Sequence, residues 1–299
     1  QPDWLWIKNR TNAYQHESFD SVRGATKRLL PSDSDSETTV SGVTSFDSDG
    51  FTLGDAYNAN KDSGNSIVAW SWKANGSGSS NSDGSITSTV SASTDSGFSI
   101  ATWSGSGSSA TIGHGLGASP ELSFIKQRTG TQDWSTQATT IGYSKYLILN
   151  GNNAQANTSG ALISSVSSTT ISVDGNGYVN GSSNTYVGYF FSSIKGYSKI
   201  GKYTGNGNAD GTFVYTGFKP AWVLIKRYSD TEYWGIIDNK RPGYNLNNKY
   251  LAPNRTDAEV TYGVADLLSN GFKNRGTGSM FNTSGSNYLY MAFAENPFV

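Results

Sequence analysis

The chain lacks cysteine, and only two of its 299 residues are histidine. Without cysteine there is no disulfide framework, no zinc–thiolate site, no iron–sulfur cluster and no cysteine nucleophile. Two histidines, His16 and His114, are too few for a metal site built from several imidazole groups. We therefore expect no cofactor. The compartment stays open, because a protein with a large core can work outside the cell without disulfides.

Charge of either sign is also scarce. Charged residues make up 15% of the chain, the formal net charge is −1, and lysine and arginine do not cluster. This removes the electrostatic basis for nucleic-acid binding. No run of about 18 apolar residues occurs, which excludes a membrane-spanning helix. Aromatic residues, at 13%, argue against disorder. We expect a folded protein whose partners include neither nucleic acid nor a membrane.

What the chain does contain is an internal repeat. A proline followed by mostly apolar residues and an Ile-Lys pair begins three segments, and three further landmarks follow each segment in the same order. They are a Lys-x-Leu triplet, an Asp-Gly or Asn-Gly pair and an apolar closing segment. The three copies comprise 2–10, 27–29, 49–50 and 65–70; 120–128, 145–147, 176–177 and 184–189; and 220–227, 249–251, 270–271 and 287–293. Such recurrence predicts a threefold repeat.

A fifth landmark precedes only the second and third copies, at residues 97–116 and 196–218. We therefore expect an incomplete first repeat over 1–74, a second over 97–195 and a third over 196–299. The Gly/Ser-rich segment 75–96 is predicted to be a linker or an exposed strand. The first repeat would lack two strands and expose pairing edges. On this ground we expect the chain to be a piece of a longer protein.

Within each repeat, apolar and polar residues alternate over short runs bounded by turn residues. The pairs Asp49-Gly50, Asn176-Gly177 and Asn270-Gly271 favour hairpin turns. No stretch keeps a helical period. The predicted fold is all-β, with tandem antiparallel β-sandwich modules of jelly-roll or lectin-like type in about three repeats.

Patterns that would support catalysis are few, and we expect no catalytic residues. No nucleophile elbow occurs, and neither histidine lies in a nucleophile motif. A glycosidase needs two carboxylates beside the scissile bond. The carboxylates considered are Asp20, Asp133, Glu232 and Asp238.

The spacing Asp-x-x-Arg occurs at the same place in two repeats, as Asp20 with Arg23 and as Asp238 with Arg241. We interpret each as an ion pair that braces a turn. The second repeat has Thr139 or Thr140 in this region, so the pair is not expected there.

Asp47 and Asp49 lie in a segment similar to the start of a calcium loop. No glutamate follows at the EF-hand spacing. The other two repeats carry neutral residues in the same landmark. A hairpin turn therefore explains the segment better, and the two aspartates stay weak candidates for a metal.

The loops that follow the three Ile-Lys pairs contain four aromatic residues in all: Tyr14, Trp134, Tyr233 and Trp234. Exposed tyrosine and tryptophan rings can stack on sugar faces and offer a polar group as well. They are our candidates for contact with a glycan or a partner. The alternative is core packing, because each occupies a similar place in its repeat.

The repeat motifs resemble those of tail-fibre-like and virion structural proteins of tailed bacteriophages, a family common among marine phages. The segments that carry the resemblance are 68–74, 83–88, 97–105, 112–117, 203–207, 213–218 and 291–295, together with the three Ile-Lys segments. The resemblance implies lectin-like β-sandwich modules on an external, extracellular part of the virion. It also implies assembly as a homotrimer or another multimer, with other virion proteins as partners, and transfers no catalytic residue.

Three functional hypotheses follow. The first is a non-enzymatic virion protein, a tail fibre or receptor-binding component that contacts carbohydrate on the host surface. The second is a purely structural subunit of a fibre shaft, capsid decoration or extracellular filament that assembles through its β edges. The third is a polysaccharide depolymerase.

Overall fold

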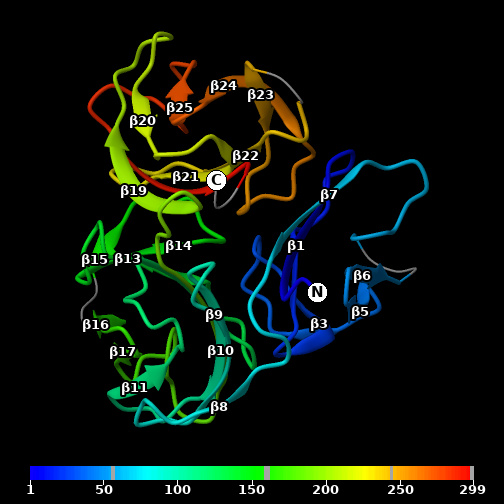
Figure 1. Cartoon of the computed structure of the whole chain (residues 1–299), viewed down its shortest axis with the longest axis vertical. Coiled ribbons are helices and arrows are strands. Elements are labelled where there is room, and N and C mark those ends of the chain that lie inside the picture. The colour runs from blue at the N-terminus through cyan, green and yellow to red at the C-terminus, as the bar shows by residue number, and fades with distance from the viewer. Residues whose placement is uncertain (55–57, 158–161, 243–244, 297–299) are drawn as a thin grey trace.

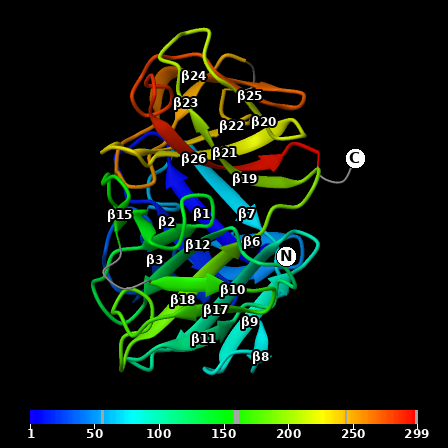
Figure 2. The same ribbon diagram turned by 90° about the vertical axis from the view of Figure 1, so that its left-hand side faces the viewer.

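The computed structural model describes residues 1–54, 58–157, 162–242 and 245–296. These residues form strands and no helix, and the paired strands are antiparallel. The predicted all-β sandwich fold is therefore confirmed. Figure 1 shows three β-rich parts around a common centre, with the first repeat in blue to cyan and the third in yellow-green to red. Figure 2 shows the same parts from the side.

The first repeat forms one five-stranded sheet and one separate hairpin. The sheet order is β4 (Thr38–Thr39), β3 (Gly24–Leu29), β2 (Glu17–Asp20), β1 (Trp4–Asn9) and β7 (Ile67–Trp72). The hairpin consists of β5 (Val43–Asp47) and β6 (Gly50–Leu53), so Asp49-Gly50 lies at its turn as predicted.

The second repeat forms an eight-stranded sheet and a three-stranded sheet. The large sheet runs β15 (Ala156–Asn157), β14 (Lys145–Ile148), β13 (Ser135–Ala138), β12 (Leu122–Gln127), β18 (Thr185–Phe191), β10 (Phe98–Ser104), β9 (Ser88–Ser93) and β8 (Ser79–Asn81). The small sheet runs β11 (Ala110–Gly113), β17 (Thr170–Val173) and β16 (Ile163–Val166). Because β8 and β9 extend the large sheet, segment 75–96 contains strands and is not simply a linker.

The third repeat forms two four-stranded sheets. One runs β19 (Ser198–Thr204), β26 (Asn287–Ala294), β21 (Pro220–Arg227) and β22 (Trp234–Asp238). The other runs β20 (Phe213–Tyr215), β25 (Gly271–Asn274), β24 (Val260–Leu268) and β23 (Asn247–Tyr250).

The hairpin prediction was wrong in the second repeat. Its β16–β17 turn lies between Val166 and Thr170, and Asn176-Gly177 follows β17 instead. The Ser167 hydroxyl accepts backbone N–H bonds from Thr169 at 3.2 Å and Thr170 at 2.9 Å, which closes this turn without an Asn-Gly pair. Serine can close a turn in this way because its side chain substitutes for a backbone acceptor.

The inner faces of the three large sheets meet in one shared core. Alternation along β1 sends Trp4 and Trp6 into this core, whereas Leu5 and Ile7 pack beneath the β5–β6 hairpin. The Trp4 ring lies 4.4 Å from Trp72 of its own repeat and 4.6 Å from Tyr189 of the second, between ring centroids. The three modules thus pack around a common core and are not arranged as separate domains in a row.

Candidate functional site

Both predicted Asp–Arg ion pairs are present and buried. Arg23 Nε lies 2.5 Å from Asp20 Oδ2, and Arg241 Nε lies 2.6 Å from Asp238 Oδ2. In each pair the other carboxylate oxygen accepts the backbone N–H of the arginine, at 2.8 Å for Arg23 and 3.0 Å for Arg241. The carboxylate therefore braces the turn, as the spacing indicated.

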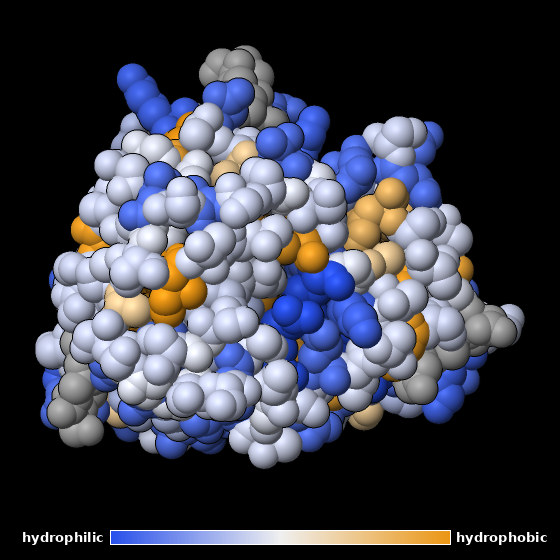
Figure 3. Space-filling model, turned by 90° about the horizontal axis from the view of Figure 1, so that it is seen from below, coloured by the Kyte–Doolittle hydropathy of each residue, from blue (hydrophilic) through white to orange (hydrophobic). Residues whose placement is uncertain are grey.

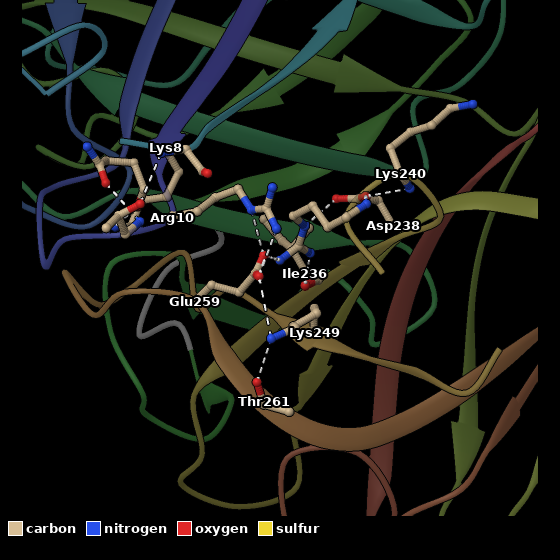
Figure 4. A network of polar contacts seen from close by, with 12 residues as sticks. Lys8, Arg10, Ile236, Asp238, Lys240, Lys249, Glu259 and Thr261 are labelled. Carbon is tan, nitrogen blue, oxygen red and sulfur yellow. Dashed lines mark hydrogen bonds and ion pairs between the residues drawn. The ribbon is translucent and has the colours of Figure 1, made fainter. Parts of the chain in front are cut away.

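Each ion pair continues into a neighbouring repeat through a glutamate. Glu259 accepts a hydrogen bond from Arg241 at 3.0 Å and two from Arg10 of the first repeat, both at 2.9 Å (Figure 4). Glu37 bonds in the same way to Arg23 and to Arg128 of the second repeat. Burial opposes ionisation of both glutamates, but the arginines outweigh it and lower their pKa.

The aspartates also bond to the shared core. Tyr189 donates its hydroxyl proton to Asp20 at 2.7 Å, and Trp70 donates its indole N–H to Asp238 at 3.0 Å. Trp6 of β1 and Phe124 of β12 are equivalent residues of their repeats. Trp6 pairs with Trp70 and Phe124 pairs with Tyr189, so the two donors also hold equivalent positions.

The second repeat fills the equivalent place with apolar side chains. The strand registers put Ala138 of the second repeat where the other two repeats have Asp20 and Asp238. They also make Met291 of the third repeat the counterpart of the donors Tyr189 and Trp70. Ile141, three residues after Ala138, packs against the core instead of an arginine. Thr139 and Thr140 follow Ala138 directly, so they lie in the predicted region, but Ala138 holds the aligned position.

Trp134 and Trp234 do not contact solvent. They are 0% and 1% exposed, and their indole N–H groups donate at 2.9 Å to carbonyl oxygens of the preceding repeat, Leu30 and Ile148. Of the two alternatives for these residues, the structure shows core packing. His16, eight residues after Lys8, takes the place of these tryptophans in the first repeat and is fully buried, which lowers its pKa.

Tyr14 lies in the corresponding loop of the first repeat and is half-buried. It donates its hydroxyl proton to Asp62 at 2.5 Å, and this hydrogen bond raises its pKa. The Lys61 ammonium lies 5.1 Å from the ring centroid. The ring is thus engaged with the segment that precedes β7.

Asp47 ends β5, and Asp49 lies in the β5–β6 turn. Asp47 accepts a hydrogen bond from Thr52 at 2.8 Å across the hairpin. Within the described ranges no three His, Asp or Glu side chains gather in a way that could hold a metal ion.

Tyr233, by contrast, lines an open groove on the third repeat. The cavity measures about 340 Å³, within the range of small-ligand sites. Tyr250 and Tyr262 line it from β23 and β24, and Phe281 closes it from the loop before β26. Polar groups are supplied by Glu232, Arg255 and Ser279.

The rings of this tyrosine groove are held in place. The Arg255 guanidinium lies 4.4 Å from the Tyr233 ring centroid. Tyr250 packs edge-on against Phe281 at 5.7 Å, and burial raises the Tyr250 pKa. A Cβ atom added to Gly278 would lie 2.8 Å from the Tyr262 hydroxyl, so this glycine is what allows the ring to lie so close to the backbone. Tyr262 nevertheless keeps 41% of its surface exposed.

Sequence analysis identified Tyr233 but missed Tyr250 and Tyr262. Tyr250 belongs to the Lys-Tyr-Leu landmark, and Tyr262 lies on a strand that pairs with it. Only the pairing of β23 with β24 brings these rings to the loop after β21.

A second cavity, of about 530 Å³, lies where the second and third repeats meet. It is lined by Glu121, Ser193 and Lys195 of the second repeat and by Lys199 and Tyr215 of the third. It presents a single aromatic ring, whereas the tyrosine groove presents four. On the face seen in Figure 3, apolar residues form small scattered groups and no single large patch.

No helix in the described part of the chain could cross a membrane. One protein-family model, the domain of unknown function DUF7483, matches residues 1–297. The searches of curated proteins and of solved structures found no match.

Proposed function

The chain belongs to the DUF7483 family of domains of unknown function, and we propose that it is a non-catalytic carbohydrate-binding component of a bacteriophage virion. The carbohydrate part of the proposal rests on the tyrosine groove. The virion part rests on the resemblance of the repeat motifs to tail-fibre-like proteins.

The groove has the properties that sugars require. Tyrosine rings offer flat apolar faces for the C–H groups of a pyranose together with a polar hydroxyl. Tyr262 is exposed and backed by Gly276 and Gly278, so stacking on it costs little reorganisation. Glu232 and Arg255 are placed to bond with sugar hydroxyls at the groove edge.

A virion appendage would make such a site effective. A single shallow groove binds weakly, but several copies in a homotrimer or another multimer raise the overall affinity through effective concentration. The proposed ligand is carbohydrate on the host-cell surface, and the proposed location is an external appendage that contacts other virion proteins.

The depolymerase hypothesis finds no support in its two main carboxylates. Asp20 and Asp238 are buried and bonded to arginine, so neither faces a polysaccharide. The structural-subunit hypothesis has one observation in its favour, the edge of β7 that pairs with no strand of the described residues.

Replacing Tyr262 by alanine should weaken carbohydrate binding about three- to tenfold, because one aromatic contact contributes about 0.5–1.5 kcal/mol. The labelled protein is first applied to an array of bacterial surface glycans, and the best ligand is then titrated by calorimetry. Gly278→Ala should give a smaller loss, since the added methyl displaces the Tyr262 ring without removing it.

Tyr215→Ala is the matched control, because this exposed tyrosine lies outside the groove. It should bind as the unmodified protein does. An array without any signal above background, or a Tyr262→Ala variant with unchanged affinity, would rule out the groove as a carbohydrate site.

A further inference from the structure

The closing strand of the first sheet has one unpaired edge. In the second and third repeats the equivalent strands, β18 and β26, are paired on both sides, with β12 and β10 and with β21 and β19. Within the described residues β7 pairs with β1 alone and ends its sheet.

The backbone groups of this edge can be identified from the register. The Arg10 N–H donates to the Ser66 carbonyl at 2.8 Å, so the backbone groups of Ser66 face β1. In an antiparallel pair every second residue does the same, and the backbone N–H and C=O groups of Val68, Trp70 and Trp72 therefore also face β1. The alternate residues, Ala69 and Ser71, point their backbone N–H and C=O groups the other way. Both are exposed, which leaves this edge open for pairing.

The same edge is used in the other two repeats. Gly188 and Phe190 are the counterparts of Ala69 and Ser71, and they pair with Ala101 and Ser99 of β10. In the third repeat Tyr290 and Ala292 pair with Gly201 and Lys199 of β19. Two of three equivalent edges in this molecule therefore hold a strand.

The two strands that fill these edges share a pattern. Each has an isoleucine that faces the closing strand, an aromatic residue three positions later and a glycine two positions after that. These are Ile100, Trp103 and Gly105 in β10 and its end, and Ile200, Tyr203 and Gly205 in β19 and its end.

The inward side chains of these strands help to close the shared core. Ile100 and Ile200 both belong to it, next to Tyr189 and Met291. Beside the free edge, Trp70 remains 8% exposed, whereas its counterparts Tyr189 and Met291 are 0% and 1% exposed. An isoleucine opposite Trp70 would cover this remaining surface.

We propose that the free edge of β7 binds, in antiparallel orientation, an extended segment with the pattern of β10 and β19. The bound strand adds backbone hydrogen bonds at Ala69 and Ser71 and places its isoleucine against Trp70. This is recognition by strand addition, in which the backbone supplies affinity and alternate side chains supply specificity. The proposal is independent of carbohydrate binding.

The test uses a synthetic peptide of residues 97–105, titrated into the full chain by calorimetry and by tryptophan fluorescence. We expect saturable binding of one peptide per chain, at least tenfold tighter than a scrambled peptide of the same composition. A second peptide, of residues 196–205, should compete with it. Failure of both peptides to bind at millimolar concentration would overturn the proposal.

Ser71→Pro locates the binding site. Proline is tolerated on an edge strand but removes the outward N–H group, so peptide affinity should fall at least tenfold. Ser71→Ala keeps that N–H and should bind as the unmodified protein does. Unchanged affinity in Ser71→Pro would mean that the peptide binds elsewhere, against the proposal.

A second measurement covers the case in which Ser71→Pro does not fold. The peptide is then methylated on the backbone nitrogen of the residue that corresponds to Ala101, whose N–H is expected to bond across to β7. The unmodified protein should bind this peptide at least tenfold more weakly, whereas equal binding would exclude pairing at the edge.

Discussion

Arg23→Met is expected to destabilise the protein by about 3–5 kcal/mol, the cost of leaving a buried charge without its partner. Arg23 is buried, and its guanidinium bonds Asp20, Glu37 and Tyr189 together with two carbonyl oxygens. Glu37 keeps its bonds to Arg128 in the variant, but Asp20 loses its only cationic partner among the described residues. The measurement is urea denaturation followed by fluorescence.

The second repeat indicates how the loss can be repaired. Its own Ala138 and Ile141, together with Met291 of the third repeat, hold the positions of Asp20, Arg23 and Tyr189. The triple variant Asp20→Ala, Arg23→Ile, Tyr189→Met copies this arrangement into the first. It should be more stable than Arg23→Met alone, because removing a whole buried polar network is often near neutral.

Lys219→Met is the control for charge removal at the surface. Its ion pair with Glu295 spans 2.7 Å, but the side chains are 49% and 27% exposed, so the change should stay below about 1 kcal/mol. A triple variant that is less stable than Arg23→Met would show that the two arrangements are not interchangeable.

Sequence patterns were sufficient for the local part of this network and insufficient for its long-range part. The spacing of Asp20 and Arg23 defines a turn ion pair, because both groups lie three residues apart in one loop. The contact of Asp20 with Tyr189 spans 169 positions. It depends on how sheets from two repeats pack, and no local spacing encodes that packing.

The same limit explains the outcome for the aromatic candidates. Trp134 and Tyr233 occupy neighbouring places in equivalent loops, yet one is buried and the other lines a groove. The difference arises because Trp134 reaches the Leu30 carbonyl of the adjacent repeat, whereas Tyr233 turns toward β23 and β24 of its own repeat. Turn residues are similarly ambiguous as a sequence signal, because different residues can close the same kind of turn. A serine turn at Ser167 and an Asn-Gly turn both close hairpins in this chain.

The protein is expected to become more stable as the pH rises from 8 to about 10. The lysine of each Ile-Lys pair is buried, and its ammonium donates hydrogen bonds to backbone carbonyl oxygens. Burial lowers the pKa of these lysines to about 8, although nearby carboxylates partly oppose it. The residues are Lys8, Lys126 and Lys226.

The sign follows from proton linkage. Between pH 8 and 10.5 the unfolded chain keeps protons that the folded lysines have released, so the free energy of unfolding rises with pH. The slope is at most ~1.4 kcal/mol per pH unit for each lysine. Buried tyrosines act in the opposite direction above pH ~10, because burial raises the pKa of Tyr290 to about 12 and that of Tyr203 well above its usual value. A stability maximum near pH ~10 should result.

Urea denaturation at half-unit intervals from pH 7 to 11 tests this profile. Lys8→Met removes one of the three titrating groups and should lower the slope between pH 8 and 10 by about one third. Lys8 is the suitable position because its ammonium bonds to Asn9 and Asn12 close by in the chain, whereas Lys126 and Lys226 also bond to the preceding repeat. A free energy of unfolding that stays level or falls between pH 8 and 9.5 would mean that these lysines keep their protons in the folded state.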